Sequence, residues 1–125
     1  MRYTLLLHYP EMDPASLGAL AMAEGQRAFS EYASALQQAG VLVSAEVLQP
    51  SSETMTLTLV DDSPHLATGP FASAKDHLGG IVVIDVPDLD AALDWGKSAP
   101  ALAWGAVEVR PGALFTVDGA WRPNT

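Results

Sequence analysis

The stretch Gly80–Ser98, with the sequence GIVVIDVPDLDAALDWGKS, decides the fold class of this chain. It opens on a nearly continuous apolar run, Gly80–Val86, which is typical of a central strand. A helix then starts at Asp88, a residue type that favours the N-cap position, and Asp90 places negative charge in its first turn. The helix is predicted to end near Ser98. A strand that runs directly into a helix indicates a domain that combines both.

The N-terminal side of this stretch adds another strand and another helix. Arg2–Tyr9 is rich in apolar and aromatic residues and predicts a strand. Asp13 then serves as the N-cap of a long helix, Pro14–Ala39. Gly18 and Gly25 weaken its first half, so we expect fraying or a break there. The apolar stripe of this helix is predicted to contain Leu17, Leu20, Ala21, Ala28, Phe29, Tyr32 and Leu36.

Three further strands follow from apolar runs and from alternation. Val41–Leu48 and Glu53–Val60 are predicted strands, and the second alternates threonines with Met and Leu. Gly105–Pro111 is predicted as the last strand of the domain. Asp61–Leu78 shows no strong periodicity and is predicted as a turn-rich loop. We expect residues Gly112–Thr125 to form a tail that packs on the domain or on a partner subunit.

The order of these elements predicts an α+β domain that resembles the ferredoxin-like split β-α-β arrangement. In that arrangement both helices cover one face of an antiparallel sheet. The other face would then have no helix over it, and the sheet of a second copy is the expected cover. The sequence therefore predicts one domain, residues 1–111, with the tail 112–125, assembled as a homodimer.

Composition and charge limit the partners of this 125-residue chain. Its 15 acidic and 6 basic residues give a net charge of −9, which repels phosphate backbones and anionic lipids. We therefore expect no nucleic-acid partner and no membrane partner. There is no cysteine, and the histidines lack metal-site spacing, so no metal and no cofactor are expected. The apolar run Leu5–Leu7 is too short for a signal peptide, which indicates a cytoplasmic protein.

Alternation along the strands separates an aliphatic face from a mixed one. Tyr3, Leu5 and Leu7 are predicted to face the helices. The opposite face mixes apolar, hydroxyl and ionisable groups, as expected of a dimer interface that encloses a small cleft. Its predicted members are Thr4, Leu6, His8, Leu42, Ser44, Glu46, Leu48, Glu108 and Arg110.

The segment Thr68–Ile81, TGPFASAKDHLGGI, resembles the signature of the DGPF-motif proteins of the YCII-related superfamily. That signature reads Asp-Gly-Pro-Phe-Ala-Glu-(Thr/Ser)-Lys-Glu, a variable residue and Leu-Gly-Gly. The likeness extends over nearly the whole domain and implies a ferredoxin-like fold with dimers of the α/β-barrel type. Thr68 and Ser73 replace two carboxylates of the signature, which puts any activity of those carboxylates in doubt. The superfamily has a proposed His–Asp pair with its histidine on the first helix, and this helix contains no histidine.

The candidate site residues come from the mixed face and from the motif. His8 and Arg110 are candidate catalytic groups, since an imidazole can act as a base near neutral pH. The alternative for His8 is an interface histidine that is hydrogen-bonded to Thr or Glu46. Gly69 and Pro70 are predicted to form a tight turn that seats Phe71 in the core. The candidate ligand-binding residues are Glu46, Gly69, Pro70, Phe71, Lys75, Asp76 and His77.

Two functions fit this pattern. The first is a small-ligand-binding or regulatory homodimer, linked to transcriptional or stress signalling because some DGPF proteins are associated with extracytoplasmic-function sigma factors. The second is a small cofactor-free acid–base enzyme of the isomerase, lyase or oxygenase type that uses the dimer cleft. Fold alone does not separate the two, since one fold hosts many functions.

Overall fold

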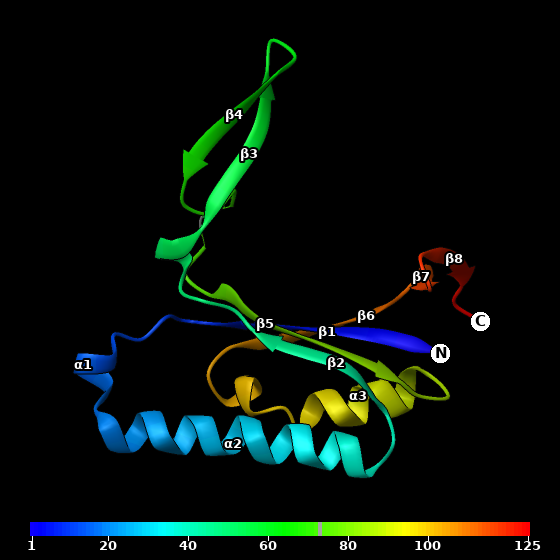
Figure 1. Ribbon diagram of the computed structural model, residues 1–125. Helices are drawn as coiled ribbons and strands as arrows, with labels where there is room; N and C mark the ends of the chain where they lie inside the picture. Colours follow the sequence, from blue (N-terminus) through cyan, green and yellow to red (C-terminus); the bar gives the residue numbers. More distant parts are fainter. Residues whose placement is uncertain (73) are drawn as a thin grey trace.

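The structure is a computed structural model that describes residues 1–72 and 74–125 (Figure 1). Its described part is α+β, with a four-stranded antiparallel sheet in the order β2-β5-β1-β6 and two separate hairpins, β3-β4 and β7-β8. The helices are α1 (Pro14–Leu17), α2 (Ala19–Gln38) and α3 (Leu89–Lys97), with short 3-10 turns at Ser51–Glu53 and Pro100–Ala103. The strands are β1 (Arg2–Tyr9), β2 (Leu42–Val47), β3 (Met55–Val60), β4 (Ser63–Thr68), β5 (His77–Asp85), β6 (Ala106–Pro111), β7 (Leu114–Val117) and β8 (Ala120–Pro123).

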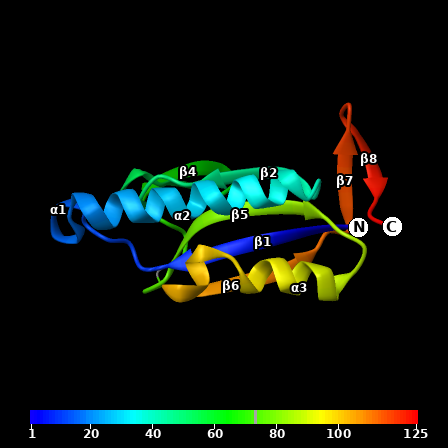
Figure 2. The same cartoon turned by 90° about the horizontal axis from the view of Figure 1, so that it is seen from below.

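Helices α2 and α3 lie side by side on one face of the sheet (Figures 1 and 2). The core lies between them and the sheet, and its fully buried side chains are Leu5, Leu7, Leu36 and Ile84. The predicted helix-facing side of β1 is therefore confirmed. No helix of the described residues covers the opposite face, which we call the open sheet face. No helix in the described part of the chain is both long and apolar enough to cross a membrane.

The predicted helix starts and the predicted break are confirmed. Asp13 accepts a hydrogen bond from the backbone N–H of Ala15, and Asp88 accepts one from Ala91. Gly18 separates α1 from α2 with φ +89°, a conformation that glycine adopts without steric cost. One predicted member of the apolar stripe is wrong: Leu20 is 74% exposed, because the break at Gly18 leaves it in the first turn of α2, beyond the core.

The second strand contains an irregularity that overturns one face assignment. Leu42 pairs with Ile84 and Ala45 pairs with Val82, so one extra residue lies between the two pairs. This bulge shifts the alternation, and Leu42 packs against the core instead of lying on the open sheet face. Ser44 and Glu46 are opposite Val83 and Ile81, on the open sheet face as predicted.

The β3-β4 hairpin projects from the sheet as an arm (Figure 1). The prediction of a loop over Asp61–Leu78 is wrong in its first part, because Ser63–Thr68 is a strand paired with β3. Asp61 and Asp62 both have positive φ, 50° and 63°, as a tight two-residue turn requires. The sequence of β4, SPHLAT, hides this strand because it contains a proline and is short in β-branched residues.

The C-terminal residues form a second hairpin, β7-β8, with the predicted turn at Asp118–Gly119. Asn124 fastens it to the first strand. The Asn124 side chain donates to the carbonyls of Arg2 and Gly112 at 2.9 and 2.6 Å, and its oxygen accepts from the N–H of Arg2 at 2.7 Å. The Arg2 guanidinium also lies 3.9 Å from the centroid of the Phe115 ring. The tail is thus a separate hairpin anchored to β1 at the end of the sheet where β6 leads into it.

Candidate functional site

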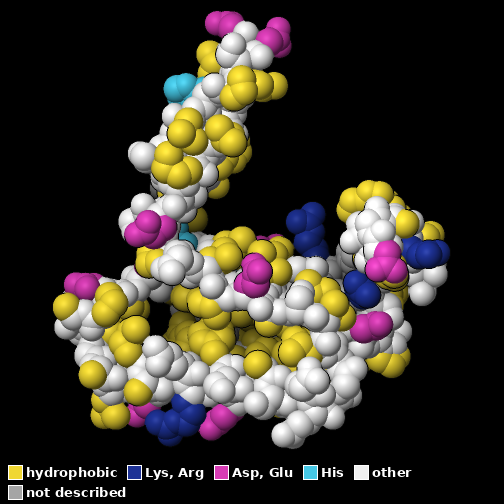
Figure 3. Space-filling view, in the orientation of Figure 1, with side chains coloured by type: hydrophobic (Ala, Val, Ile, Leu, Met, Phe, Trp, Pro, Cys, Tyr) yellow, Lys and Arg dark blue, Asp and Glu magenta, His cyan; other side chains and the backbone are white. Residues whose placement is uncertain are grey.

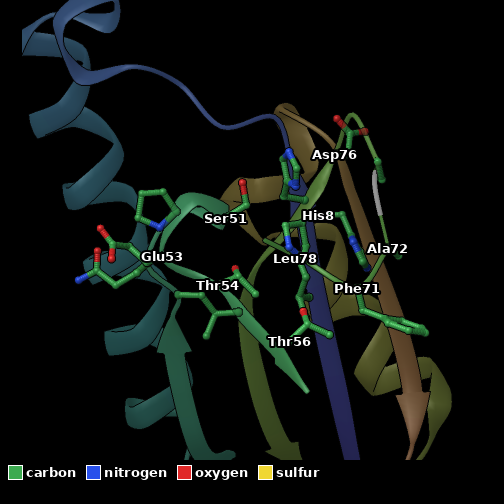
Figure 4. A pocket seen from close by; sticks show the side chains of 15 residues that line it. His8, Ser51, Glu53, Thr54, Thr56, Phe71, Ala72, Asp76 and Leu78 are labelled. Carbon is green, nitrogen blue, oxygen red and sulfur yellow. The ribbon is translucent and has the colours of Figure 1, made fainter. Parts of the chain in front are cut away.

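A pocket of about 590 Å³ lies where the arm joins the end of the sheet (Figure 4). It collects side chains from β1, from the segment before β3, from the base of the arm and from the motif that precedes β5. The lining residues are His8, Leu48, Gln49, Pro50, Ser51, Glu53, Thr54, Thr56, Pro70, Phe71, Ala72, Ala74, Asp76, His77 and Leu78. In the view of Figure 4, His8 lies between Ser51 on one side and Asp76 on the other.

His8 reaches the pocket from the end of β1 and lies beside a carboxylate. Its Nε2 atom is shielded from solvent and lies 2.6 Å from Oε1 of Glu108 on the neighbouring strand β6. The two atoms are within ion-pair distance, but their angles do not form a hydrogen bond. The carboxylate beside His8 is therefore Glu108 and not Glu46, one of its predicted hydrogen-bond partners. The alternation of β6 places Glu108 on the same face of the sheet as His8.

Asp76 and His77 enter the pocket at the start of β5. The pairing of β1 with β5 shifts between Leu7 and His8, and this irregularity sets His8 opposite Leu78. A Cβ atom at Gly79 would meet the ring of Tyr9, whose hydroxyl donates to the Gly79 carbonyl at 3.1 Å, so a larger residue would displace this ring. Packing against Tyr9 therefore explains the first glycine in the Leu-Gly-Gly part of the motif.

Glu11 fastens the rim of the pocket to the segment before the arm. Its carboxylate accepts hydrogen bonds from the backbone N–H and the hydroxyl of Ser51, at 2.6 and 2.8 Å. Partial burial acts to raise the pKa of Glu11, but the two hydrogen bonds from Ser51 and the charge of His77 outweigh it and lower the pKa below its ordinary value. The carboxylate therefore stays charged and keeps Ser51 in place at neutral pH.

The motif turn differs from its prediction at one residue. Gly69 has φ +96°; its N–H donates to the Thr54 carbonyl at 2.8 Å, and its carbonyl accepts from the Thr56 hydroxyl at 2.6 Å. The backbone bends at Gly69, where the tight turn is predicted, but Phe71 is 84% exposed and does not enter the core. The reason is that the turn closes the arm, which stands away from the helices, so Phe71 lines the pocket.

The other predicted residues lie away from the pocket. Arg110 is opposite Thr4, and Glu46 is opposite Ile81, so both lie on the open sheet face at its two edge strands. Lys75 is exposed and does not line the pocket, and Ser73 lies outside the described residues. The sequence did not single out Ser51, Glu53, Thr54 or Thr56 as site residues, because only the hairpin brings them to the motif.

The donor set of the pocket favours an organic ligand. No group of three His, Cys, Asp or Glu side chains in the described residues is arranged to hold a metal ion. Hydroxyl groups of Ser51, Thr54 and Thr56 and the imidazoles of His8 and His77 supply hydrogen bonds. Apolar walls come from Leu48, Pro50, Pro70, Phe71 and Leu78. A pocket with a few polar groups among apolar side chains is typical of small-molecule sites.

Fold and pocket define a small α+β protein with a site at one end of its sheet. The family model of the YCII-related domain matches residues 1–116, and the chain belongs to this family. Over 80 residues the chain is 36% identical to the "Uncharacterized protein R00369" of Rhizobium meliloti (strain 1021). That match covers 62% of this chain and 64% of the relative. The family model over residues 1–116 establishes the family, and the name of the relative states no activity.

Proposed function

We propose that this YCII-related protein is a ferredoxin-like homodimer that binds a small organic ligand in the pocket at the base of the arm. The observation that carries the proposal is the pocket itself, which collects the His8 and His77 imidazoles and three hydroxyl groups against apolar walls. The resemblance to DGPF-motif proteins supports a regulatory use of this binding in transcriptional or stress signalling.

The open sheet face supports the homodimer. The strand order β2-β5-β1-β6, with the helices on one face, agrees with a ferredoxin-like arrangement. Leu6, Ile81 and Val83 lie on the uncovered face and are only partly buried. An apolar sheet face gains free energy when another sheet removes it from water. A second copy with the same face provides such a sheet.

The walls of the pocket specify the kind of ligand. Leu48, Phe71 and Leu78 favour an aliphatic or aromatic body. The hydroxyl and imidazole groups favour a hydrogen-bonding head. Asp76 and Glu53 line the same space, and their negative charges disfavour a strongly anionic ligand. We therefore expect a neutral or cationic molecule with an apolar body.

A thermal-shift screen of neutral and cationic metabolites tests the proposal. A ligand at about 100 times its dissociation constant adds ~2.7 kcal/mol of stability, which raises the melting temperature by several degrees. His8→Ala should abolish the shift. The matched control is His65→Ala, because His65 is an exposed histidine on the arm that does not line the pocket. Equal loss in both variants, or no shift with any compound, would contradict ligand binding at this pocket.

The His8–Glu108 contact favours a second candidate, a small acid–base enzyme. A carboxylate 2.6 Å from one imidazole nitrogen can orient the ring and leave the other nitrogen free to move a proton. Once a ligand is found, Glu108→Gln should lower its turnover at least 100-fold while binding is kept. Glu46→Gln, on the same face but outside the pocket, should leave turnover unchanged. Binding without turnover in the unmodified protein would exclude the enzyme, and ligand binding would remain as the function of the pocket.

A further inference from the structure

The arm has one apolar face and one hydroxyl-bearing face. The cross-strand pairs Leu57–Leu66 and Leu59–Pro64, with Met55, form what we call the apolar arm face. The pair Thr58–His65, with Thr56, lies on the other side. Leu57 and Leu59 are 70% and 71% exposed, so the apolar arm face is turned to water in the single chain. Every residue of β4 is exposed as well.

Such an arm is not stable by itself. A lone two-stranded hairpin is marginal in water, and a contiguous exposed apolar patch marks an interaction site. Among the described residues from Met55 to Thr68, the carboxylates of Asp61 and Asp62 are the only acidic groups, and both are at the tip. The length of the apolar arm face is therefore free of charge and suited to a dry contact.

The C-terminal hairpin exposes a second apolar surface. Leu114 and Trp121 lie on the same side of this hairpin, together with Thr116 and Pro123, and we call this side the outer tail face. Leu114 is 55% exposed and Trp121 is 70% exposed. The hairpin stands at the opposite end of the sheet from the arm and rises on the same side, away from the helices (Figures 1 and 2).

We propose that the apolar arm face of each subunit packs on the outer tail face of a second copy of this chain. This inference rests on the proposed homodimer and adds its geometry. In a pair of stacked open sheet faces, a two-fold axis across the strands exchanges the two ends of the sheet. Each arm then meets the partner's tail, and both apolar hairpins are covered in one isologous contact. An axis along the strands would instead bring the two arms to the same end.

Charge supports the pairing of arm with tail. The arm carries Asp61 and Asp62 at its tip and no lysine or arginine in its described residues. Arg2 and Arg122 lie at the C-terminal hairpin on the side of Phe115, opposite the outer tail face, because Arg122 pairs with Phe115 across the strands and Arg2 stacks on the same ring. The space-filling view shows only acidic groups at the end of the arm, and both basic and acidic groups at the C-terminal hairpin (Figure 3). In a chain of net charge −9, the acidic tip of the arm is repelled less by an end of a second copy that carries two arginines and Asp118 than by the tip of another arm.

Area gives a second reason for an arm contact. Each strand of the arm has six residues, so one face of the arm covers roughly 200 Å² at about 3.3 Å per residue and about 4.8 Å between strands. The open face of the four-stranded sheet covers roughly 400 Å² by the same dimensions. That is about half of the ~800 Å² that each partner buries in a stable complex. The tail hairpin, with four residues in each strand, offers roughly 130 Å² by the same dimensions, so one arm–tail contact in each direction adds roughly 260 Å² per subunit. The sum of roughly 660 Å² lies within the range of stable complexes.

Cross-linking tests the inference, because the chain contains no cysteine. Leu57→Cys and Trp121→Cys place single thiols on the two exposed faces, where substitution leaves folding nearly unchanged. The two purified variants are mixed, allowed to exchange subunits and treated with a short bis-maleimide. We expect a covalent dimer from the mixture and none from either variant alone. Native mass measurement of the same samples reports the assembly separately.

The outcomes are distinct. A cross-link in Leu57→Cys alone would place the two arms together and overturn the arm–tail contact. A dimeric mass without any cross-link in the mixture would overturn it too, while the homodimer of the proposed function would stand. A monomeric mass would overturn both. As an independent readout, Leu57→Asp should weaken dimerisation at least tenfold, and Thr58→Asp, on the opposite face of the same strand, should weaken it far less.

Discussion

Strands β1 and β3 carry the same kind of apolar alternation and meet opposite surroundings. Leu5 and Leu7 of β1 are 0% and 1% exposed under the helices, whereas Leu57 and Leu59 of β3 are 70% and 71% exposed on the arm. Alternation fixes which side chains share a face in both strands. The cover of that face depends on the rest of the chain, and for the arm the residues that the structure describes supply none. The comparison separates residues that stabilise the subunit by burial from residues that stay exposed on the arm.

The first way to test this comparison is to truncate one leucine in each strand. Leu5→Ala removes a fully buried side chain and should lower the free energy of unfolding by about 2–5 kcal/mol. Leu57→Ala should change it by less than about 0.5 kcal/mol in dilute protein, since exposed positions contribute little. Urea unfolding followed by circular dichroism measures both values.

Protein concentration gives the control for this pair of variants. The cost of Leu5→Ala should not depend on concentration, because its contacts lie within one subunit. The cost of Leu57→Ala should grow as concentration rises, because the apolar arm face would then be covered by a second copy. A large cost of Leu57→Ala at every concentration would mean that the arm is packed by its own chain.

The helix side of the sheet also has a buried titratable group, whereas the titratable groups of the arm are exposed. Tyr32 of α2 is buried, and its hydroxyl donates to the Trp95 carbonyl at 2.6 Å. Burial raises the pKa of Tyr32 to about 12, from 10.0 in an open chain. The folded state therefore holds this proton more tightly than the unfolded state. The resulting stability is complete below pH 10 and is lost as the pH rises from 10 to about 12.

Tyr32→Phe isolates that effect. At neutral pH it removes one hydrogen bond and should cost about 1 kcal/mol, because Ser98 still donates to the Trp95 carbonyl. Above pH 10 the variant should lose less stability with rising pH than the unmodified protein. The pKa of Tyr9 is also raised, by burial and by the charge of Glu11, so part of the alkaline loss persists in the variant. Identical pH profiles would show that Tyr32 is not buried in solution.

Much of this fold was predictable from local chemistry. The N-caps Asp13 and Asp88, the break at Gly18 and the turn at Asp118–Gly119 each follow from the conformational preference of the residue itself. The arm was missed because the two aspartates at its tip do not resemble a common turn pair and because Pro64 weakens the strand signal. The bulge after Leu42 was missed because a register shift depends on the partner strand.

The pocket residues that were predictable come from single segments, either one strand or the motif, which supplies Pro70, Phe71, Asp76 and His77. His8 and Glu108 follow from alternation, and both lie where it placed them. Phe71 was assigned to the core because aromatic residues are usually buried, but the position of the arm leaves it in the open pocket. Ser51 and Thr56 join the site through hydrogen bonds with Glu11 and Gly69, contacts between segments that no short-range pattern contains.

The smallest expected effect concerns the point where the covered sheet and the uncovered arm meet. Thr56 lines the pocket and donates to the Gly69 carbonyl at 2.6 Å, whereas Thr58, two residues further along the same face of the arm, is exposed and does not line the pocket. Thr56→Val should cost about 1 kcal/mol and speed hydrogen exchange of the Gly69 amide, since that amide closes the base of the arm on Thr54. Thr58→Val should do neither. If the two variants behave alike, the base of the arm opens in solution and the pocket is not preformed, and its ligand would have to order the arm on binding.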